Sequence, residues 1–423
     1  PPARWWRAFG DPALETLIDR GLDENFSLRS AWARLNQAQA AAGREGAALL
    51  PSLDAQASAS RQRPPGGDWD GQREAALSAA YEVDLWGRIA DQADAAALDA
   101  LASAADLRTA AITLSANIAE TWYRVVEQRA QVALLEEQAA TNRQLLSLVE
   151  LRFRSGLAAA SDVHRQRQLL EQTNGDLVRE KSRLSVSTHQ LAVLLGTTPD
   201  RANLPASREF PSLSPLPATG IPSALVQRRP DMRSALLRVE AADARAAAAV
   251  AAQYPRLNLT AAMTSSSAGG TLFSDWVSNL TAQLLGPVFD GGRRRAEAAR
   301  TAAVVDERLA DYGQTLLEAI AEVEDAIVGE TAQRAYLDSV QAQLRQAEQV
   351  VERERLRYFQ GDSDYLSVLD AMRSRQQLQR QVITARRELM AERIGLLRAL
   401  AGGWEMAPPV SSSRRAAAAR EQS

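Results

Sequence analysis

Two stretches of the chain, about 205 residues apart, carry the same helical pattern with the same interruption. In each stretch, seam residues recur alternately three and four positions apart, the spacing of helices packed in a coiled coil. The two sets are Val132, Leu135, Ala139, Asn142, Leu146, Val149, Phe153 and Leu337, Val340, Leu344, Ala347, Val351, Glu354, Tyr358. Gly156 and Gly361 follow the two sets, and Gly favours the left-handed conformation that ends a helix. The pattern predicts an internal duplication of helical hairpins with these glycines at the tips.

The second arm of each expected hairpin continues the heptad pattern. Its positions are Val163, Leu170, Leu177, Leu184, Leu191 in the first copy and Val368, Arg375, Val382, Leu389, Leu396 in the second. From about residue 88 to 153, and from about 293 to 358, the sequence is Ala-rich and contains no Pro. Such segments predict helices roughly 100 Å long at ~1.5 Å per residue. On periodicity alone, a structural coiled coil is an equally good interpretation.

Four segments before the long helices alternate apolar and polar residues, the pattern of strands with one apolar face. Their alternating apolar positions are Leu53, Ala55, Ala57, Ala59; Leu77, Ala79, Tyr81, Val83, Leu85; Leu257, Leu259, Ala261, Met263; and Leu280, Ala282, Leu284, Val288. Strands of about ten residues are long enough to cross a membrane when tilted. Trp69, Trp86, Phe273 and Trp276 fall near the expected strand ends, where interfacial aromatic side chains lie.

Four strands are too few to close a barrel, and open strand edges in lipid leave backbone groups without partners. If these strands span a membrane, several chains must therefore share one barrel, and three copies would give about 12 strands. The expected fold is mainly α with a β-barrel part. Long antiparallel helical hairpins would make up the α part, and each chain would add four strands to a trimeric, 12-stranded transmembrane barrel.

The composition argues against several classes of function. The net charge of -3 gives no basis for nucleic-acid binding. The chain has no Cys, which excludes thiolate metal sites and thiol catalysis, and it has only two His. His164 and His189 read as solvated helix residues. No phosphate-binding loop and no nucleophile elbow is present, so we expect no enzyme activity, no cofactor and no metal site.

The chain divides by pattern into eight segments. We expect an N-terminal helical segment (1–48), a first strand pair (49–87), a first hairpin (88–196), a proline-rich linker (197–230), a helix (231–253), a second strand pair (254–290), a second hairpin (291–404) and a disordered tail (405–423). The pair Arg228 and Arg229 marks a helix end, and Pro230 suits the first turn of the next helix.

Several longer motifs resemble one family. They are WWRAFGDPALETLIDRGLDENFSL at 5–28, LLPSL at 49–53, YEVDLWGR at 81–88, LVQRRPDM at 225–232, PVFDGGRRRA at 287–296 and LLRALAGGW at 396–404. The chain resembles the TolC-like outer-membrane efflux proteins, most closely their lipoprotein-type, NodT/OprM-like branch. The resemblance spans nearly all of the chain except the tail, and that family is duplicated internally. It implies that the long hairpins form a periplasmic α-barrel that continues the trimeric transmembrane barrel.

The resemblance implies a gate at the hairpin tips. A constricting acidic residue matches Asp370, and a contact between the two repeats matches Tyr358 and Asp162. Asp162 also suits an ordinary helix cap, so both readings stay open. The residues after Gly361 are acidic or polar here, where well-known members carry a basic residue. A salt bridge between the repeats is therefore not expected at that position.

The resemblance also implies the function, which we expect to be an exit duct of a tripartite efflux pump that passively conducts drugs or other small molecules. The alternatives are the duct of a type I protein secretion system and a soluble coiled-coil scaffold. The expected partners are two further copies of the chain, a periplasmic adaptor, an inner-membrane transporter of the RND type and outer-membrane lipid. The expected location is the outer membrane of a Gram-negative bacterium, with a lipid anchor on a Cys missing from this sequence.

Overall fold

The computed structural model describes residues 4–63, 65–215, 228–267, 273 and 275–400. The expected tail (405–423) and part of the expected linker lie outside the described residues. The helical elements in chain order are η1 (Trp5–Phe9), α1 (Pro12–Glu24), α2 (Phe26–Ala47), α3 (Arg88–Arg154), α4 (Ala160–Leu194), η2 (Pro199–Arg201), α6 (Pro230–Ala251), α7 (Arg293–Gln360) and α8 (Tyr365–Ala399). The strands are β1 (Ser52–Gln62), β2 (Asp70–Val83), β3 (Arg256–Ser267) and β4 (Val277–Leu285). None of the helices in these described ranges is both long and apolar enough to cross a membrane.

The residues form two compact units. The tip unit comprises 1–30, 108–229 and 317–423, and the sheet unit comprises 31–107 and 230–316. The boundaries differ from the segments expected from sequence, because α3 and α7 each pass from one unit into the other. The sequence pattern predicts where helices and strands begin and end, whereas the compact units depend on which of these elements pack against one another.

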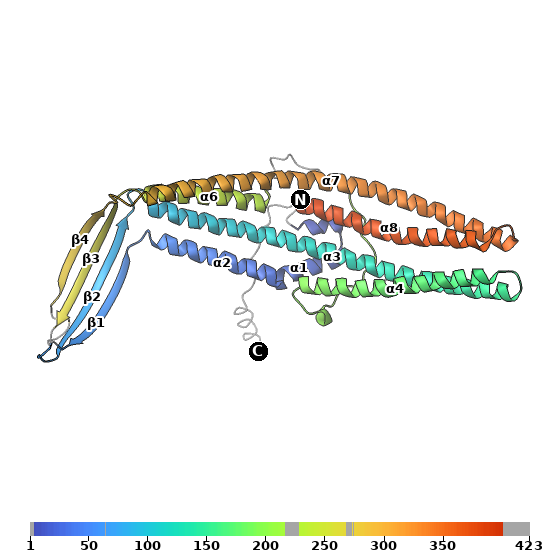
Figure 1. The fold of residues 1–423 in the computed structure, drawn as a ribbon, viewed down its shortest axis with the longest axis horizontal. Helices are drawn as coiled ribbons and strands as arrows, with labels where there is room; N and C mark the ends of the chain where they lie inside the picture. Colours follow the sequence, from blue (N-terminus) through green and yellow to red (C-terminus); the bar gives the residue numbers. More distant parts are fainter. Residues whose placement is uncertain (1–3, 64, 216–227, 268–272, 274, 401–423) are drawn as a thin grey trace. The chain divides into compact units, whose positions relative to one another are not determined.

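In the tip unit, α3 folds back on α4 and α7 folds back on α8 (Figure 1). Many of the heptad residues of both copies lie in buried clusters at the contacts between helices. Leu337, Val340, Val382 and Leu389, for example, form one buried cluster between α7 and α8. The absence of Pro and the high Ala content let α3 and α7 run for 67 and 68 residues.

The N-terminal elements pack on α3 within the tip unit. Asp11 caps α1 by accepting from the backbone N–H groups of Ala13 and Leu14. Its second carboxylate oxygen accepts a hydrogen bond from Trp122 Nε1 at 2.9 Å. The WWRAF motif of the sequence thus forms the buried η1, whose Trp5 donates to Ser115 Oγ at 3.2 Å.

The sheet unit contains one antiparallel sheet in the order β1-β2-β3-β4. Its register places Leu53, Ala79, Ala261 and Leu280 in one row across all four strands. The neighbouring row consists of Asp54, Ser78, Ala262 and Asn279. Because directly paired residues point to the same face, the sheet has one apolar face and one mostly polar face.

The apolar face of the sheet is exposed within this chain. Leu53 is 68% exposed, Leu280 83% and Leu284 67%. Val288 was expected on the same strand, but β4 ends at Leu285 and Val288 is fully exposed beyond it. Two glycines of the turn after β4, Gly291 and Gly292, have positive φ and directly precede α7, which begins at Arg293.

Candidate functional site at the hairpin tips

The two hairpin tips have matching backbone geometry. Gly156 has φ 73° and Gly361 has φ 88°, both in the left-handed region. After each Gly, a backbone N–H bonds back to a helix carbonyl at the same spacing, Leu157 to Arg152 at 2.8 Å and Asp362 to Arg357 at 2.9 Å. This arrangement closes a helix through a left-handed Gly. The duplicated Gly therefore has the same role in both repeats.

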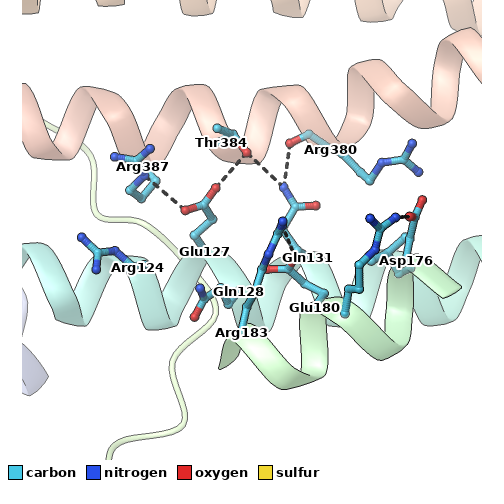
Figure 2. A pocket seen from close by; sticks show the side chains of 12 residues that line it. Arg124, Glu127, Gln128, Gln131, Asp176, Glu180, Arg183, Arg380, Thr384 and Arg387 are labelled. Carbon is cyan, nitrogen blue, oxygen red and sulfur yellow. Dashed lines mark hydrogen bonds and ion pairs between the residues drawn. The ribbon is translucent and has the colours of Figure 1, made fainter. Parts of the chain in front are cut away.

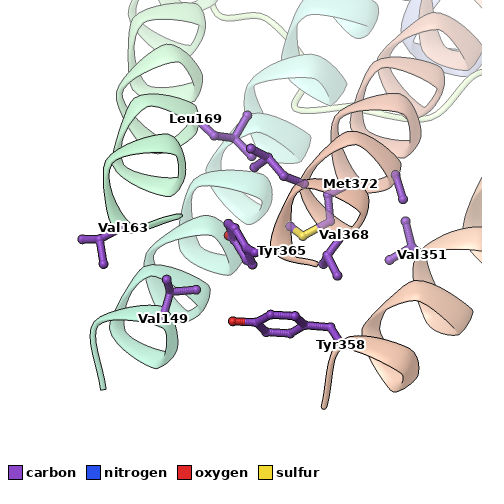
Figure 3. Packing of buried hydrophobic residues seen from close by; sticks show 10 residues of the cluster. Val149, Val163, Leu169, Val351, Tyr358, Tyr365, Val368 and Met372 are labelled. Atoms are coloured by element: carbon purple, nitrogen blue, oxygen red, sulfur yellow. The ribbon is translucent and has the colours of Figure 1, made fainter. Parts of the chain in front are cut away.

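A hydrophobic cluster joins the two hairpins just behind the tips. Its buried members are Val149 from α3, Val163 and Leu169 from α4, Val351 and Tyr358 from α7, and Tyr365, Val368, Leu369, Ala371 and Met372 from α8. Figure 3 shows the ring of Tyr358 pointing from α7 toward Val149 of α3. The cluster therefore couples the position of one hairpin tip to that of the other.

A buried hydrogen-bond network crosses the same junction. Tyr365 Oη donates to Gln166 Oε1 at 2.6 Å, and Gln166 Nε2 donates to the backbone carbonyl of Asn142 at 2.8 Å. Gln376 Nε2 donates to Asn142 Oδ1 at 3.0 Å, while Asn142 Nδ2 donates to Thr173 Oγ1 at 3.0 Å. All five residues are at most 2% exposed. Since α8 supplies Tyr365 and Gln376, the network ties the second hairpin to the first.

The structure does not pair the expected residues Tyr358 and Asp162. Asp162 lies at the third position of α4, where its carboxylate accepts from the backbone N–H of Ala159 at 3.2 Å. The Tyr358 hydroxyl is buried and has no hydrogen-bond partner among the described residues. Its ring lies instead under the guanidinium of Arg152, 4.5 Å from the ring centroid. Asp162 thus takes part in the local cap of α4, while Tyr358 contacts the first repeat through Arg152 of α3 instead of through Asp162.

Asp370 lies on the side of α8 away from the cluster. It is exposed, whereas its neighbours Leu369 and Ala371 are buried. The described residues contain no group of acidic or histidine side chains arranged to hold a metal. Asp370 of one chain is therefore available to solvent or to another molecule.

Comparison with known proteins identifies the family of this chain. The model of the outer membrane efflux protein family matches residues 17–197 and 221–402. The chain belongs to the outer membrane efflux protein family. It is thus an outer-membrane component of efflux, with a mostly helical fold and a four-stranded sheet.

Individual members of the outer membrane efflux protein family match along nearly the whole chain. The pyoverdine export outer membrane protein OpmQ of Pseudomonas putida is 34% identical, covering 97% of this chain and 90% of its own. The outer membrane protein OprJ of Pseudomonas aeruginosa is 31% identical, covering 95% of this chain and 86% of its own. The crystal structure of the outer membrane protein VceC from Vibrio cholerae superposes with a TM-score of 0.87 at 28% identity, covering 96% of this chain and all of that one.

Sequence reasoning missed most of the buried network of this efflux protein. The signal was Asn142, a polar residue on an otherwise apolar seam, which in coiled coils fixes register and partner. Its partners Gln166 and Gln376 lie 24 and 234 residues away. No local pattern distinguishes these two glutamines from solvated helix residues, so only the packing of the hairpins reveals them.

Proposed function

We propose that three copies of this chain assemble into one continuous duct, with their sheets joined in a single 12-stranded barrel. The observation that carries this proposal is the sheet, which exposes an apolar face and has two edges with no partner strand within the described chain. β1 pairs only with β2, and β4 pairs only with β3. Joining β4 of one copy to β1 of the next would satisfy both edges.

The two faces of the sheet suit different surroundings. A lipid environment would accept the apolar row containing Leu53 and Leu280, and a water-filled lumen would accept the row containing Asp54 and Asn279. Exposed aromatic side chains stand near both ends of the strands: Trp69, Phe273 and Trp276 at one end, Trp86 at the other. Such residues favour the boundary between lipid and water.

The duct would act passively between other components. We propose that it receives small molecules from an inner-membrane transporter of the RND type through a periplasmic adaptor. The role that the name of OpmQ gives it, export of pyoverdine, supports a small-molecule cargo over a secreted protein. The absence of phosphate-binding and nucleophile motifs from the sequence fits a component that supplies no energy and no chemistry of its own.

The narrowest point of the duct would lie at the tips, where Asp370 of three chains forms a ring. Carboxylates held close together repel one another, and a multivalent cation relieves that repulsion. The duct should therefore conduct cations weakly and be blocked by multivalent cations added on the tip side.

Single-channel recording in planar bilayers tests both proposals. The wild-type protein should give uniform conductance steps, and a chain that inserts no channel would refute the duct. Asp370→Asn should remove most of the multivalent block. Asp362→Asn is the matched control, because Asp362 is also an exposed acid near the same tip but does not lie on α8. Equal block in both variants would place the constriction elsewhere.

A further inference from the structure

A polar pocket of about 500 Å³ lies between α3, α4 and α8 in the tip unit. Figure 2 shows its charged and amide side chains converging from the three helices. It is lined by Arg124, Glu127, Gln128, Gln131, Leu135, Asp176, Arg179, Glu180, Arg183, Arg380, Thr384 and Arg387. The volume is that of an ordinary small-molecule site.

The arginines of the pocket outnumber its acids, five to three. Arg179, Arg183 and Arg387 are paired with Asp176, Glu180 and Glu127, at 2.5, 3.1 and 3.2 Å respectively. Among the described residues, the other two arginines bond only to neutral amides. Arg380 Nη1 donates to Gln138 Oε1 at 2.8 Å, and Arg124 Nη1 reaches Gln190 Oε1 at 3.5 Å. Two guanidinium groups of this pocket therefore keep donors for an anion.

Two buried amide oxygens in the same pocket lack a donor. Gln128 is 8% exposed and Gln131 is 7% exposed, and the Oε1 atom of each has no hydrogen-bond partner in the described chain. The orientation of Gln131 is fixed, because its Nε2 donates to the carbonyl of Arg380 at 2.8 Å and to Thr384 Oγ1 at 3.3 Å. A buried acceptor without a donor is unfavourable, so these oxygens fit a ligand that brings N–H or O–H groups.

The pocket occupies one face of α3. Arg124, Gln128, Gln131 and Leu135 recur at intervals of three or four residues and therefore share that face. The opposite face of α3, about half a turn away, carries Ser115, Trp122 and Arg129, which are seven residues apart and therefore lie in one row.

The N-terminal segment and the linker cover that opposite face. Ser115 and Trp122 are bonded to Trp5 and Asp11, and Arg129 donates to the carbonyl of Pro205. In a duct, packed segments on the inner face would obstruct the passage, so the covered face is the outer one. The pocket face then points into the lumen.

We infer that this pocket is a luminal binding site for an acidic, peptide-like solute, a molecule carrying separate carboxylates for Arg124 and for Arg380 together with N–H donors for Gln128 and Gln131. The inference rests on the proposed duct, since a luminal face exists only in that assembly. The site would retain such a cargo briefly on its way out and favour it over cations of similar size.

The test is block of single channels by the tripeptide Glu-Glu-Glu, with tricarballylate as the matched probe that has three carboxylates and no N–H donors. The peptide should block at lower concentration than tricarballylate. Arg124→Gln combined with Arg380→Gln should raise the blocking concentration of the peptide by about tenfold or more, because charged hydrogen bonds are lost. Arg143→Gln, the same change at an exposed α3 position outside the pocket, should leave it unaltered.

The outcomes separate this inference from the proposed function. A protein that forms no channel would refute the duct itself. A conducting channel that the peptide does not block, or blocks equally in the double variant and in wild type, would overturn the pocket while the duct stands. Equal block by both probes would overturn the role of the two glutamines and hence the peptide-like class. Loss of block in Arg143→Gln would show that overall charge, not this pocket, attracts the peptide.

Discussion

Replacing Tyr365 by Phe removes one hydroxyl from the junction of the two hairpins. Tyr365 is 2% exposed, and its bond to Gln166 is the only direct hydrogen bond between α4 and α8 in the described tip network. Gln166 cannot rotate to compensate, because its Nε2 is held by the carbonyl of Asn142. The substitution therefore leaves a fully buried amide oxygen without a donor, which costs about 1–3 kcal/mol.

The loss of the Tyr365–Gln166 hydrogen bond weakens the docking of the two hairpins against each other as well as the stability of the folded chain. A loss of about 1–3 kcal/mol corresponds to a shift of roughly 5- to 150-fold in an equilibrium between docked and separated tips. In planar bilayers, Tyr365→Phe should raise the open probability within this range. In detergent, thermal unfolding should occur at lower temperature than in wild type.

The chain offers a matched control in Tyr358. Its ring lies in the same cluster and 5.5 Å from the ring of Tyr365, but its buried hydroxyl has no hydrogen-bond partner in the part of the chain that the structure describes. Tyr358→Phe should leave gating and stability near wild type, or stabilise the protein slightly. Equal effects of the two substitutions would refute the argument, and so would a Tyr365→Phe channel that unfolds earlier but gates normally.

Three further predictions concern the remaining parts of the tip unit. Gly361→Ala should destabilise the protein by about 1–2 kcal/mol in thermal unfolding, because φ at this position is 88°. Gly175→Ala is the control: Gly175 lies inside α4 with open space around it, so this change should stabilise the protein by about 0.5–1 kcal/mol. Arg393→Leu removes the buried partner of Glu330, whose side chain is 0% exposed, and should destabilise by about 3–5 kcal/mol. Arg334→Leu removes the other, 42% exposed partner of the same carboxylate and should cost about 1 kcal/mol or less; similar losses in the two variants would contradict the assignment. Burial raises the pKa of Glu127 above its ordinary value of 4.5, so the folded state binds more protons than the unfolded state. The free energy of unfolding should therefore fall as the pH rises from about that value. Glu127→Gln should flatten this pH dependence of the free energy of unfolding, and an unchanged pH profile would count against the argument.

The long helices and the strands follow from the sequence because their patterns are local and repeated many times. The expected helix starting at about residue 88 is α3, which begins at Arg88 and ends at Arg154. The alternation of residues 52–61 likewise predicts β1. These periods determine which face of an element is apolar, and burial of that face follows wherever a partner exists.

The tips show where such reasoning ends. Phe153 and Tyr358 occupy the same position in the two repeats, yet Phe153 is 46% exposed and Tyr358 is 8% exposed. The difference arises because the hairpins pack on each other asymmetrically, which no local pattern records. The same limit explains Asp162, whose carboxylate accepts from the backbone N–H of Ala159 and makes no hydrogen bond to the other hairpin among the described residues.

The mass of the detergent-solubilised protein tests the central claim most directly. The free edges of β1 and β4 predict a single species containing three chains of 45.9 kDa each. Native mass measurement on the intact, folded protein should therefore find a trimer and no stable smaller form. A folded monomer as the dominant species would mean that the sheet edges are satisfied in some other way, and the shared duct would be wrong.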